Sequence, residues 1–215
     1  EDHNSWRSLK SAGRTSVIFF EAKLIKMSGS RIFCTWQDIH NLNSSENNGG
    51  QICWSENILE ESVQKFGEVK AVKWLNRKEV LERSYSEILR NVISTRKGLL
   101  AEDFAGKHIA LIGTSSVEWI ESYLGIITGC ITAVPLDAAL PCEELIDLIN
   151  RSDSEALFLS PKHRPYLEAF LANCPKLQKV WMLQEEVEDV PSGVYSINEL
   201  RNTGINASAD ASCPS

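Results

Sequence analysis

The sequence has no long hydrophobic stretch and no excess of basic residues. Near its start, the longest apolar run covers only residues 17–20 and is broken by Glu21 and Lys23. This run is too short for a transmembrane helix or for the apolar part of a signal peptide. The formal net charge is -7, with 22 Lys and Arg against 29 Asp and Glu. Since nucleic-acid surfaces need clustered cations, we expect no nucleic-acid partner.

Cysteine and histidine are present, but not at the spacings that bind metals. None of the six cysteines belongs to a Cys-x-x-Cys pair, and the four histidines are scattered. We therefore expect no metal site. Cys130 and Cys142 lie in or beside a predicted buried core, where free thiols are usual. This cysteine usage indicates a reducing, cytoplasmic environment.

The clearest structural signal is a strand, helix and strand unit over residues 107–141. Its first strand is the continuous apolar run 109–112, the pattern of a strand covered on both faces. Ser115 and Glu118 have the spacing of a capping box, which predicts that a helix begins there. The side chains expected to face the sheet are Trp119, Ile120, Tyr123, Leu124 and Ile127. Gly125 and Gly129 allow a neighbouring backbone to approach closely, and residues 130–136 predict the next strand.

The alternation of helices and strands continues on both sides of this unit. Upstream, the pattern predicts a helix over residues 55–66, a hairpin over 71–75 and 80–83, and a long helix from the Ser84–Glu87 capping box. Downstream, it predicts helices from 143 and over 166–171, strands at 156–159, 179–183 and 194–197, and a last helix ending near Arg201. Such alternation predicts an α/β fold with a mainly parallel, doubly wound sheet.

Composition divides the chain into three parts. Residues 1–52 show little periodicity and include NLNSSENNGG from Asn41, which is turn and linker composition, so we expect a poorly ordered extension. Residues 53–203 carry the α/β signals. Residues 204–215 are mostly small and polar, and we expect an unstructured tail.

Several runs, taken in order, resemble one known family. They are IALIGTSSVEW, YLGIITGC and AVPLDAALPCEELIDLINRSDSEALF. A weaker resemblance extends from about Ser55 to about Leu200. The segments are similar to the early part of the adenylate-forming, or AMP-binding, synthetases, which include acyl-CoA synthetases, peptide-synthetase adenylation domains and luciferases. The resemblance implies a partial doubly wound sheet, the first part of the large N-terminal domain of such an enzyme.

The resemblance also implies a reaction. These enzymes activate a carboxylate with ATP to an acyl-adenylate and pass the acyl group to a thiol, commonly that of coenzyme A. The implied parent is an acyl-CoA synthetase for a medium- or long-chain fatty acid, with ATP, Mg2+ and coenzyme A as reactants. The family's Ser/Thr/Gly-rich phosphate loop ending in Pro-Lys occurs nowhere in the 215 residues. We therefore expect an amino-terminal fragment, truncated before that loop, with no catalytic residue, no cofactor and no adenylation activity of its own.

The nearest approach to a phosphate loop is the turn at residues 113–116. It follows a predicted strand but contains one glycine and lacks the Gly-x-Gly-x-x-Gly and Walker patterns. Its serines are better explained as helix caps. The sequence therefore favours a structural role for this turn.

One candidate ligand edge follows the strand at residues 130–136. The loop after it carries Ala138 and Ala139, at the end of a strand where α/β sheets bind ligands. The resemblance implies that this loop lies beside the nucleotide end of coenzyme A in some ligases, with basic residues after the next strand near its phosphates. Those residues are Lys162 and Arg164 here. The alternative is that both are solvated surface cations at a turn.

Two other functions remain open from the sequence. One is a non-catalytic α/β module that binds coenzyme A or a protein partner. The other is a fragment of a peptide-synthetase adenylation domain, which loads a carrier protein. The resemblance to acyl-CoA synthetases also implies that the parent enzyme acts on a carboxylic acid and contacts a membrane surface or a carrier protein.

Overall fold

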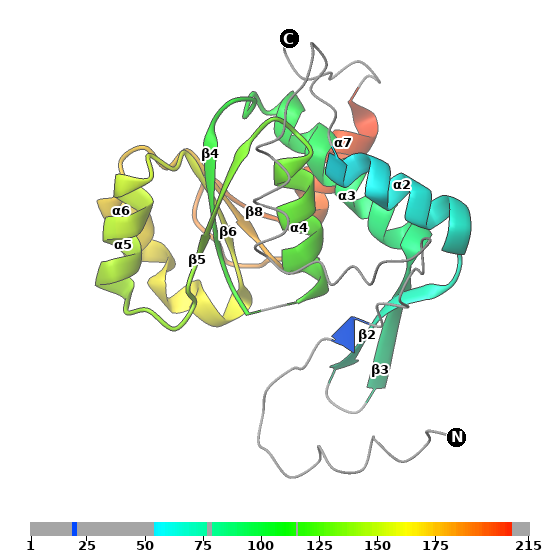
Figure 1. Cartoon of the computed structure of the whole chain (residues 1–215). Coiled ribbons are helices and arrows are strands. Elements are labelled where there is room, and N and C mark those ends of the chain that lie inside the picture. Colours follow the sequence, from blue (N-terminus) through cyan, green and yellow to red (C-terminus); the bar gives the residue numbers. More distant parts are fainter. Residues whose placement is uncertain (1–18, 21–53, 77–78, 115, 208–215) are drawn as a thin grey trace, which may run out of the picture.

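A parallel β-sheet forms the centre of the structure, and helices cover both of its faces (Figure 1). The computed structural model describes residues 19–20, 54–76, 79–114 and 116–207. The five strands of the sheet are β4 (His108–Ile112), β5 (Thr132–Leu136), β6 (Ala156–Leu159), β7 (Lys179–Met182) and β8 (Val194–Ser196). The predicted α/β class and parallel sheet are confirmed.

The helices divide between the two faces of this sheet, except for the first, which packs on the second. They are α2 (Trp54–Phe66), α3 (Tyr85–Ala101), α4 (Val117–Ile127), α5 (Cys142–Arg151), the 3-10 helix η3 (Pro161–Tyr166), α6 (Leu167–Asn173) and α7 (Ile197–Asn206). The layer of α3, α4 and α7 packs on Ile109 and Leu111, and the layer of α5 and α6 packs on Ala110 and Ile112. Successive residues of β4 thus serve opposite cores, which explains its continuous apolar run. None of the helices in the described segments is both long and apolar enough to span a membrane.

The strand order is β5-β4-β6-β7-β8, and all neighbours are parallel. From β4 the chain moves outward to β5 and then returns past β4 to β6. The order therefore reverses between β4 and β6, and in open α/β sheets ligands bind beyond the carboxyl ends of the strands at such a reversal. The edge position of β5 accommodates Pro135, because an edge strand has one side without ladder hydrogen bonds.

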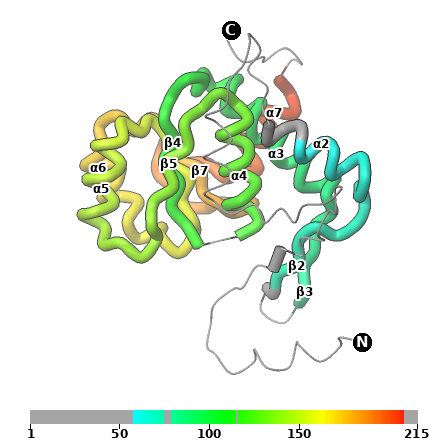
Figure 2. The backbone as a smooth tube through the Cα atoms, viewed as in Figure 1, coloured from blue at the N-terminus to red at the C-terminus, as the bar shows by residue number. Residues whose placement is uncertain are grey.

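A smaller antiparallel sheet consists of β1 (Phe19–Phe20), β2 (Lys70–Asn76) and β3 (Glu79–Ser84). The hairpin of β2 and β3 was predicted from the sequence. Figure 2 follows the chain from α2 through this hairpin, which projects away from the parallel sheet, and back along α3. Apart from β1, residues 1–52 lie outside the described residues, so their poor order stays a prediction.

Two helix starts show how the local sequence sets boundaries. At α3, the Ser84 Oγ accepts a hydrogen bond from the Glu87 N–H at 3.2 Å, and the Glu87 carboxylate accepts one from the Ser84 N–H at 2.6 Å. The predicted capping box is confirmed. At α4 the predicted cap is wrong by one residue, since the Ser116 Oγ accepts from the Trp119 N–H at 3.1 Å. The third helical residue is therefore Trp119, which has no carboxylate to complete a box, and Ser115 lies outside the described residues.

The buried side of α4 also differs from the prediction. Its buried residues are Val117, Glu121, Ser122, Gly125 and Ile126. Trp119 and Tyr123, from the predicted face, are only partly buried against the core. The reason is that α3 packs along α4 in addition to the sheet. A Cβ on Gly125 would lie 2.8 Å from the Cγ2 of Thr95, so the predicted close approach at Gly125 is confirmed.

The last helix, α7, crosses α3 at very short range. The predicted helix ends near Arg201, but α7 continues past this residue because its second half packs on α3. A Cβ on Gly204 would lie 1.9 Å from the carbonyl oxygen of Ser94, and one on Gly98 would lie 2.3 Å from that of Leu200. The two backbones can approach this closely only because both positions are glycine.

The cysteines follow the prediction only in part. Cys142 and Cys174 are free, and burial raises the pKa of both thiols. Cys130 instead forms a disulfide, so the expectation of a free thiol is wrong there. Cys130 lies in the turn between α4 and β5 and is only half-buried, where another thiol can reach it.

We expect Gly204→Ala to destabilise the fold. The added methyl group would overlap the Ser94 carbonyl, and overpacking of this kind costs about 1–3 kcal/mol, occasionally more. Urea denaturation followed by circular dichroism would measure the free energy of unfolding. Asn202→Ala is the matched control, because Asn202 is an exposed residue of the same helix. Equal stability of the two variants would contradict the close crossing of α3 and α7.

Candidate functional site

The carboxyl edge of the parallel sheet collects the loops that carry the candidate residues. The turn after β4 covers residues 113–116, the loop after β5 covers residues 137–141, and β6 leads through Ser160 into η3. Because the strands are parallel, these segments leave the sheet at the same edge. The candidates predicted from the sequence, Ala138, Ala139 and Arg164, lie on two of them.

His163 joins two of these loops from a buried position. It is 4% exposed, its Nδ1 lies 2.8 Å from the Ser160 Oγ, and its Nε2 lies 2.9 Å from the carbonyl oxygen of Ala138. A carbonyl oxygen can only accept, so Nε2 carries a proton, and the tautomer with its proton on Nε2 lets Nδ1 accept from the Ser160 hydroxyl. Both side chains are buried, so this pair fastens the loop after β5 to the start of η3. No pattern in the sequence predicts this role of His163.

The predicted ligand-edge residues reach the same edge but differ in their surroundings. Ala138 packs against the core under α5 and α6, whereas Ala139 and Lys162 are exposed. The Arg164 Nη2 donates to the carbonyl oxygens of residues 188–189 at 2.7 and 2.9 Å. Arg164 therefore holds the loop that follows β7, in addition to placing a positive charge at this edge.

The turn after β4 does not fit a nucleotide phosphate. A Cβ on Gly113 would lie 3.0 Å from the Cβ of Ser160 and 3.1 Å from the Cδ1 of Trp119, so the turn is closely packed. The Ser116 hydroxyl caps α4, and Glu118 adds negative charge in the first turn. Phosphates need a loop of open amides and hydroxyls, which the described part of this turn does not supply. The described residues also contain no group of three or more His, Cys, Asp or Glu placed to hold a metal ion.

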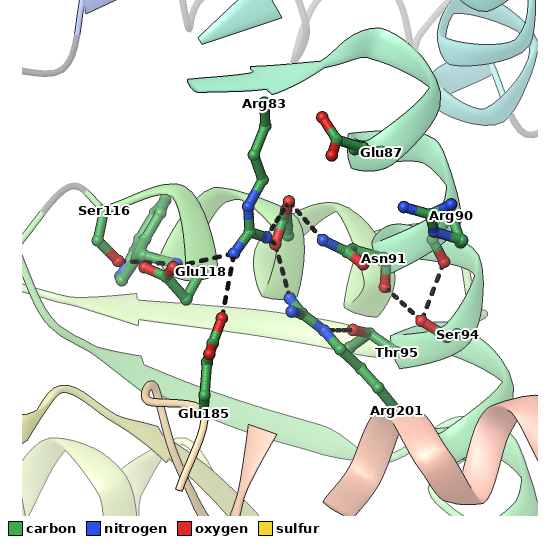
Figure 3. A network of polar contacts seen from close by, with 12 residues as sticks. Arg83, Glu87, Arg90, Asn91, Ser94, Thr95, Ser116, Glu118, Glu185 and Arg201 are labelled. Carbon is green, nitrogen blue, oxygen red and sulfur yellow. Dashed lines mark hydrogen bonds and ion pairs between the residues drawn. The ribbon is translucent and has the colours of Figure 1, made fainter. Parts of the chain in front are cut away.

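A buried ionic cluster lies close to this edge, beside the start of α4 (Figure 3). Its centre is Glu121 of α4, whose side chain is 0% exposed. The Arg83 Nη1 donates to both carboxylate oxygens of Glu121, at 2.7 Å to Oε1 and 2.6 Å to Oε2. The Arg201 Nη2 donates to the same Oε2 at 2.7 Å. Two arginines that are far apart in the sequence therefore share one buried carboxylate.

Polar residues of α3 complete the interior of this cluster. The Asn91 Nδ2 donates to the Glu121 Oε1 at 3.0 Å, and the Arg201 Nε donates to the Thr95 Oγ1 at 3.3 Å. Burial lowers the pKa of Arg201 and outweighs the opposing charge of Glu121. Burial, the largest single cause, would also lower the pKa of Arg83, but the charge and hydrogen bond of Glu121 together with the charges of Glu118 and Glu185 outweigh it, so this pKa is raised. Arg83 is thus the more strongly paired of the two guanidinium groups.

Arg83 also connects the cluster to the carboxyl edge. Its Nη2 lies 3.4 Å from the Glu118 Oε1 and 3.8 Å from the Glu185 Oε1. In Figure 3, Arg83 reaches in from β3 and Glu185 from the loop after β7. The guanidinium carbon lies 5.7 Å from the ring centre of Trp74, within the range of a cation–π contact. No sequence motif predicts this cluster. One feature does indicate it, namely that Glu121 lies four positions from both Val117 and Gly125, on the same side of the helix as these two buried residues.

A family model described as AMP-binding enzyme matches residues 59–209. The chain belongs to the AMP-binding enzyme family. The match covers the five strands of the parallel sheet, the helices from α3 to α7, the hairpin that carries Arg83, and α2 from residue 59 onward. The resemblance to adenylate-forming synthetases read from the sequence is therefore confirmed.

Individual relatives include a CoA ligase of Gibberella moniliformis (strain M3125 / FGSC 7600), 33% identical over 94 residues, which are 41% of this chain and 16% of that protein. The structure of coronafacic acid ligase from Pectobacterium brasiliense aligns with a TM-score of 0.60 at 19% identity, over 69% of this chain and 29% of that one. The anthranilate CoA ligase AuaEII, solved with anthranoyl-AMP, gives a TM-score of 0.56 at 18% identity, over 69% and 27%. At such identities the two structures support the fold alone. The chain thus spans between 16% and 29% of the length of these ligases.

We expect His163→Ala to destabilise the chain more than Ser160→Ala. Loss of the ring leaves both the Ala138 carbonyl and the Ser160 hydroxyl without this partner, and each buried unpaired group costs about 1–3 kcal/mol. Ser160→Ala keeps the bond from Nε2 to Ala138. Urea denaturation would rank the variants, and hydrogen exchange would report on the amides of residues 138–140. Equal losses of stability with unchanged exchange would show that the ring does not hold the loop.

Proposed function

We propose that this chain is part of an ATP-dependent fatty acyl-CoA synthetase. Such an enzyme joins the carboxylate of a fatty acid to the AMP portion of ATP and releases pyrophosphate. It then transfers the acyl group from this acyl-adenylate to the thiol of coenzyme A and releases AMP. The proposed reactants are a medium- or long-chain fatty acid, ATP with Mg2+, and coenzyme A.

The observation that carries this proposal is the match to the AMP-binding enzyme family over residues 59–209. The relative described as a CoA ligase supports coenzyme A as the acyl acceptor. The anthranilate ligase was solved with anthranoyl-AMP, which is an acyl-adenylate, the class of intermediate that the proposal requires. The apolar chain of the proposed substrate rests on the sequence resemblance to fatty acid ligases.

Within such an enzyme, we assign a supporting role to the described residues. The described part of the turn after β4 supplies no open loop for the phosphates of ATP, so we expect that the chain by itself does not form an acyl-adenylate. Ala138, Ala139 and Arg164 are the proposed edge for the nucleotide end of coenzyme A. Two observations support this assignment, namely the exposure of Ala139 and the bond by which His163 ties the loop of Ala138 to the segment of Arg164.

We expect the purified chain to give no fatty-acid-dependent exchange of pyrophosphate into ATP, because it lacks a phosphate loop. The coding sequence adjoining the Ser215 codon should be determined and any longer product assayed in parallel. That product should form acyl hydroxamate from fatty acid, ATP and hydroxylamine, and acyl-CoA when coenzyme A is supplied. Exchange by the purified chain alone would contradict the supporting role. Activation of amino acids with loading of a carrier protein would instead identify a peptide-synthetase domain.

In the longer enzyme, Arg164→Ala should raise the KM for coenzyme A by about fivefold, the effect expected for an exposed ionic contact worth about 1 kcal/mol. The KM values for ATP and fatty acid should stay unchanged. Arg151→Ala is the matched control, because Arg151 is exposed at the end of α5 and pairs with Asp147. Arg164→Lys separates the two roles of Arg164, because it keeps the charge but removes the planar guanidinium group whose Nη2 holds residues 188–189. A KM for coenzyme A that Arg164→Ala leaves unchanged would rule out the proposed edge.

We further propose that the protein acts in fatty acid metabolism in the cytoplasm, with peripheral membrane or carrier-protein contact. The free thiols of Cys142 and Cys174 support a reducing compartment, whereas the disulfide of Cys130 is typical of an oxidising one. Cell fractionation combined with thiol trapping of Cys130 would distinguish these compartments.

A further inference from the structure

The buried carboxylate of Glu121 has two cationic partners, and each belongs to a different peripheral element. Arg83 lies at the end of β3, in the hairpin, and Arg201 lies in α7. Their Nη atoms reach the same carboxylate oxygen, at 2.6 Å for Arg83 and 2.7 Å for Arg201. Figure 3 shows Arg83 and Arg201 entering the cluster from opposite sides. One buried anion is therefore the meeting point of the hairpin, α4 and α7.

Glu121 keeps a cationic partner as long as one of the two arginines is present. Without Arg83, Glu121 is still neutralised by Arg201, and without Arg201 it is still neutralised by Arg83. Without both arginines, a carboxylate that is 0% exposed keeps only the amide of Asn91. An unpaired buried charge is strongly destabilising, whereas a buried charge that keeps one partner is not.

The two arginines are also independent of each other in their remaining contacts. Arg83 has further anionic partners in Glu118 and Glu185, and no such pair is formed by Arg201 among the described residues. Arg201 instead contacts Thr95 of α3, and its helix is held by the close backbone crossing at Gly204. The hairpin and α7 therefore have separate anchors beyond the carboxylate that they share.

We propose that Arg83 and Arg201 act as reserves for each other in neutralising Glu121. Either the hairpin or α7 can detach while the other keeps the carboxylate paired and α4 in place against α3. If both detach, Glu121 is left as an unpaired charge between α3 and α4. These two helices therefore separate only when neither arginine pairs with Glu121. We call this arrangement, in which either Arg83 or Arg201 can neutralise Glu121, the latch.

A double-mutant cycle with one rescue variant, in the 215-residue chain, tests this latch. Arg83→Met and Arg201→Met would be made singly, together, and together with Glu121→Leu, and unfolding would be followed in urea. We expect the double variant to unfold more readily than the product of the two single effects predicts, by about tenfold or more in the unfolding equilibrium constant. Glu121→Leu in the double background removes the unpaired anion and should recover most of the loss.

The control cycle combines Arg83→Met with Arg151→Met, whose arginine has 74% of its side chain exposed and shares no partner with the cluster. Here the two effects should simply multiply. The latch is overturned if the arginine double variant also shows no excess effect, or if Glu121→Leu gives no recovery. Where the double variant does not fold at all, recovery of cooperative unfolding by Glu121→Leu supports the latch, and failure to recover it counts against it.

Hydrogen exchange separates this latch from a general loss of stability. In Arg201→Met, exchange should quicken in α7 while the hairpin amides keep their protection, and in Arg83→Met the pattern should be reversed. If either single variant quickened exchange in both elements, the two arginines would not be reserves for each other.

Discussion

A carboxylate with no solvent exposure lies between the helices on one face of the sheet, and their arrangement follows from the need to keep it paired. Glu121 cannot find donors on its own helix, where Val117 and Gly125 are its neighbours one turn away. Its donors come instead from β3, α3 and α7. The glycines make this geometry possible, because Gly125 brings α3 against α4, and Gly98 with Gly204 brings α7 against α3. The pairing of Glu121 and the close approach of the helices at these glycines thus favour the same packing of α3, α4 and α7.

The carboxyl edge of the sheet is held mainly by contacts to the main chain. His163 ties the loop after β5 to η3 through the Ala138 carbonyl, and Arg164 holds the loop after β7 through two carbonyl oxygens. Such contacts depend on backbone position rather than on the identity of the residue that supplies the carbonyl. They shape the candidate ligand edge without supplying the open amides of a phosphate site. This is the physical basis for our proposal that this part of an AMP-binding enzyme supports the site rather than carries out nucleotide chemistry.

The sequence predicted those features that depend on local or periodic patterns. The strand at residues 156–159 and the Ser84 capping box were found as predicted, because burial on two faces and a four-residue cap both leave direct marks in the sequence. The cap of α4 was missed by one residue because Ser115 and Ser116 are adjacent, and a sequence pattern does not distinguish which of them caps the helix. The roles of Glu121 and His163 were missed for a different reason. Apart from Ser160, three positions from His163, their partners lie 25 to 80 positions away, and no local pattern encodes such pairs.

Arg83 links the buried cluster to the candidate site, and its chemistry explains how one residue serves both. Its Nη1 points inward to Glu121, while its Nη2 lies near Glu118 and Glu185 at the carboxyl edge. A lysine has a single ammonium group and could not face both sets of carboxylates, whereas the planar fork of arginine can. Arg164 holds the same loop further along, at residues 188–189, so two guanidinium groups contact this loop. The buried cluster and the candidate ligand edge are therefore connected through the loop after β7, which Arg83 and Arg164 both contact.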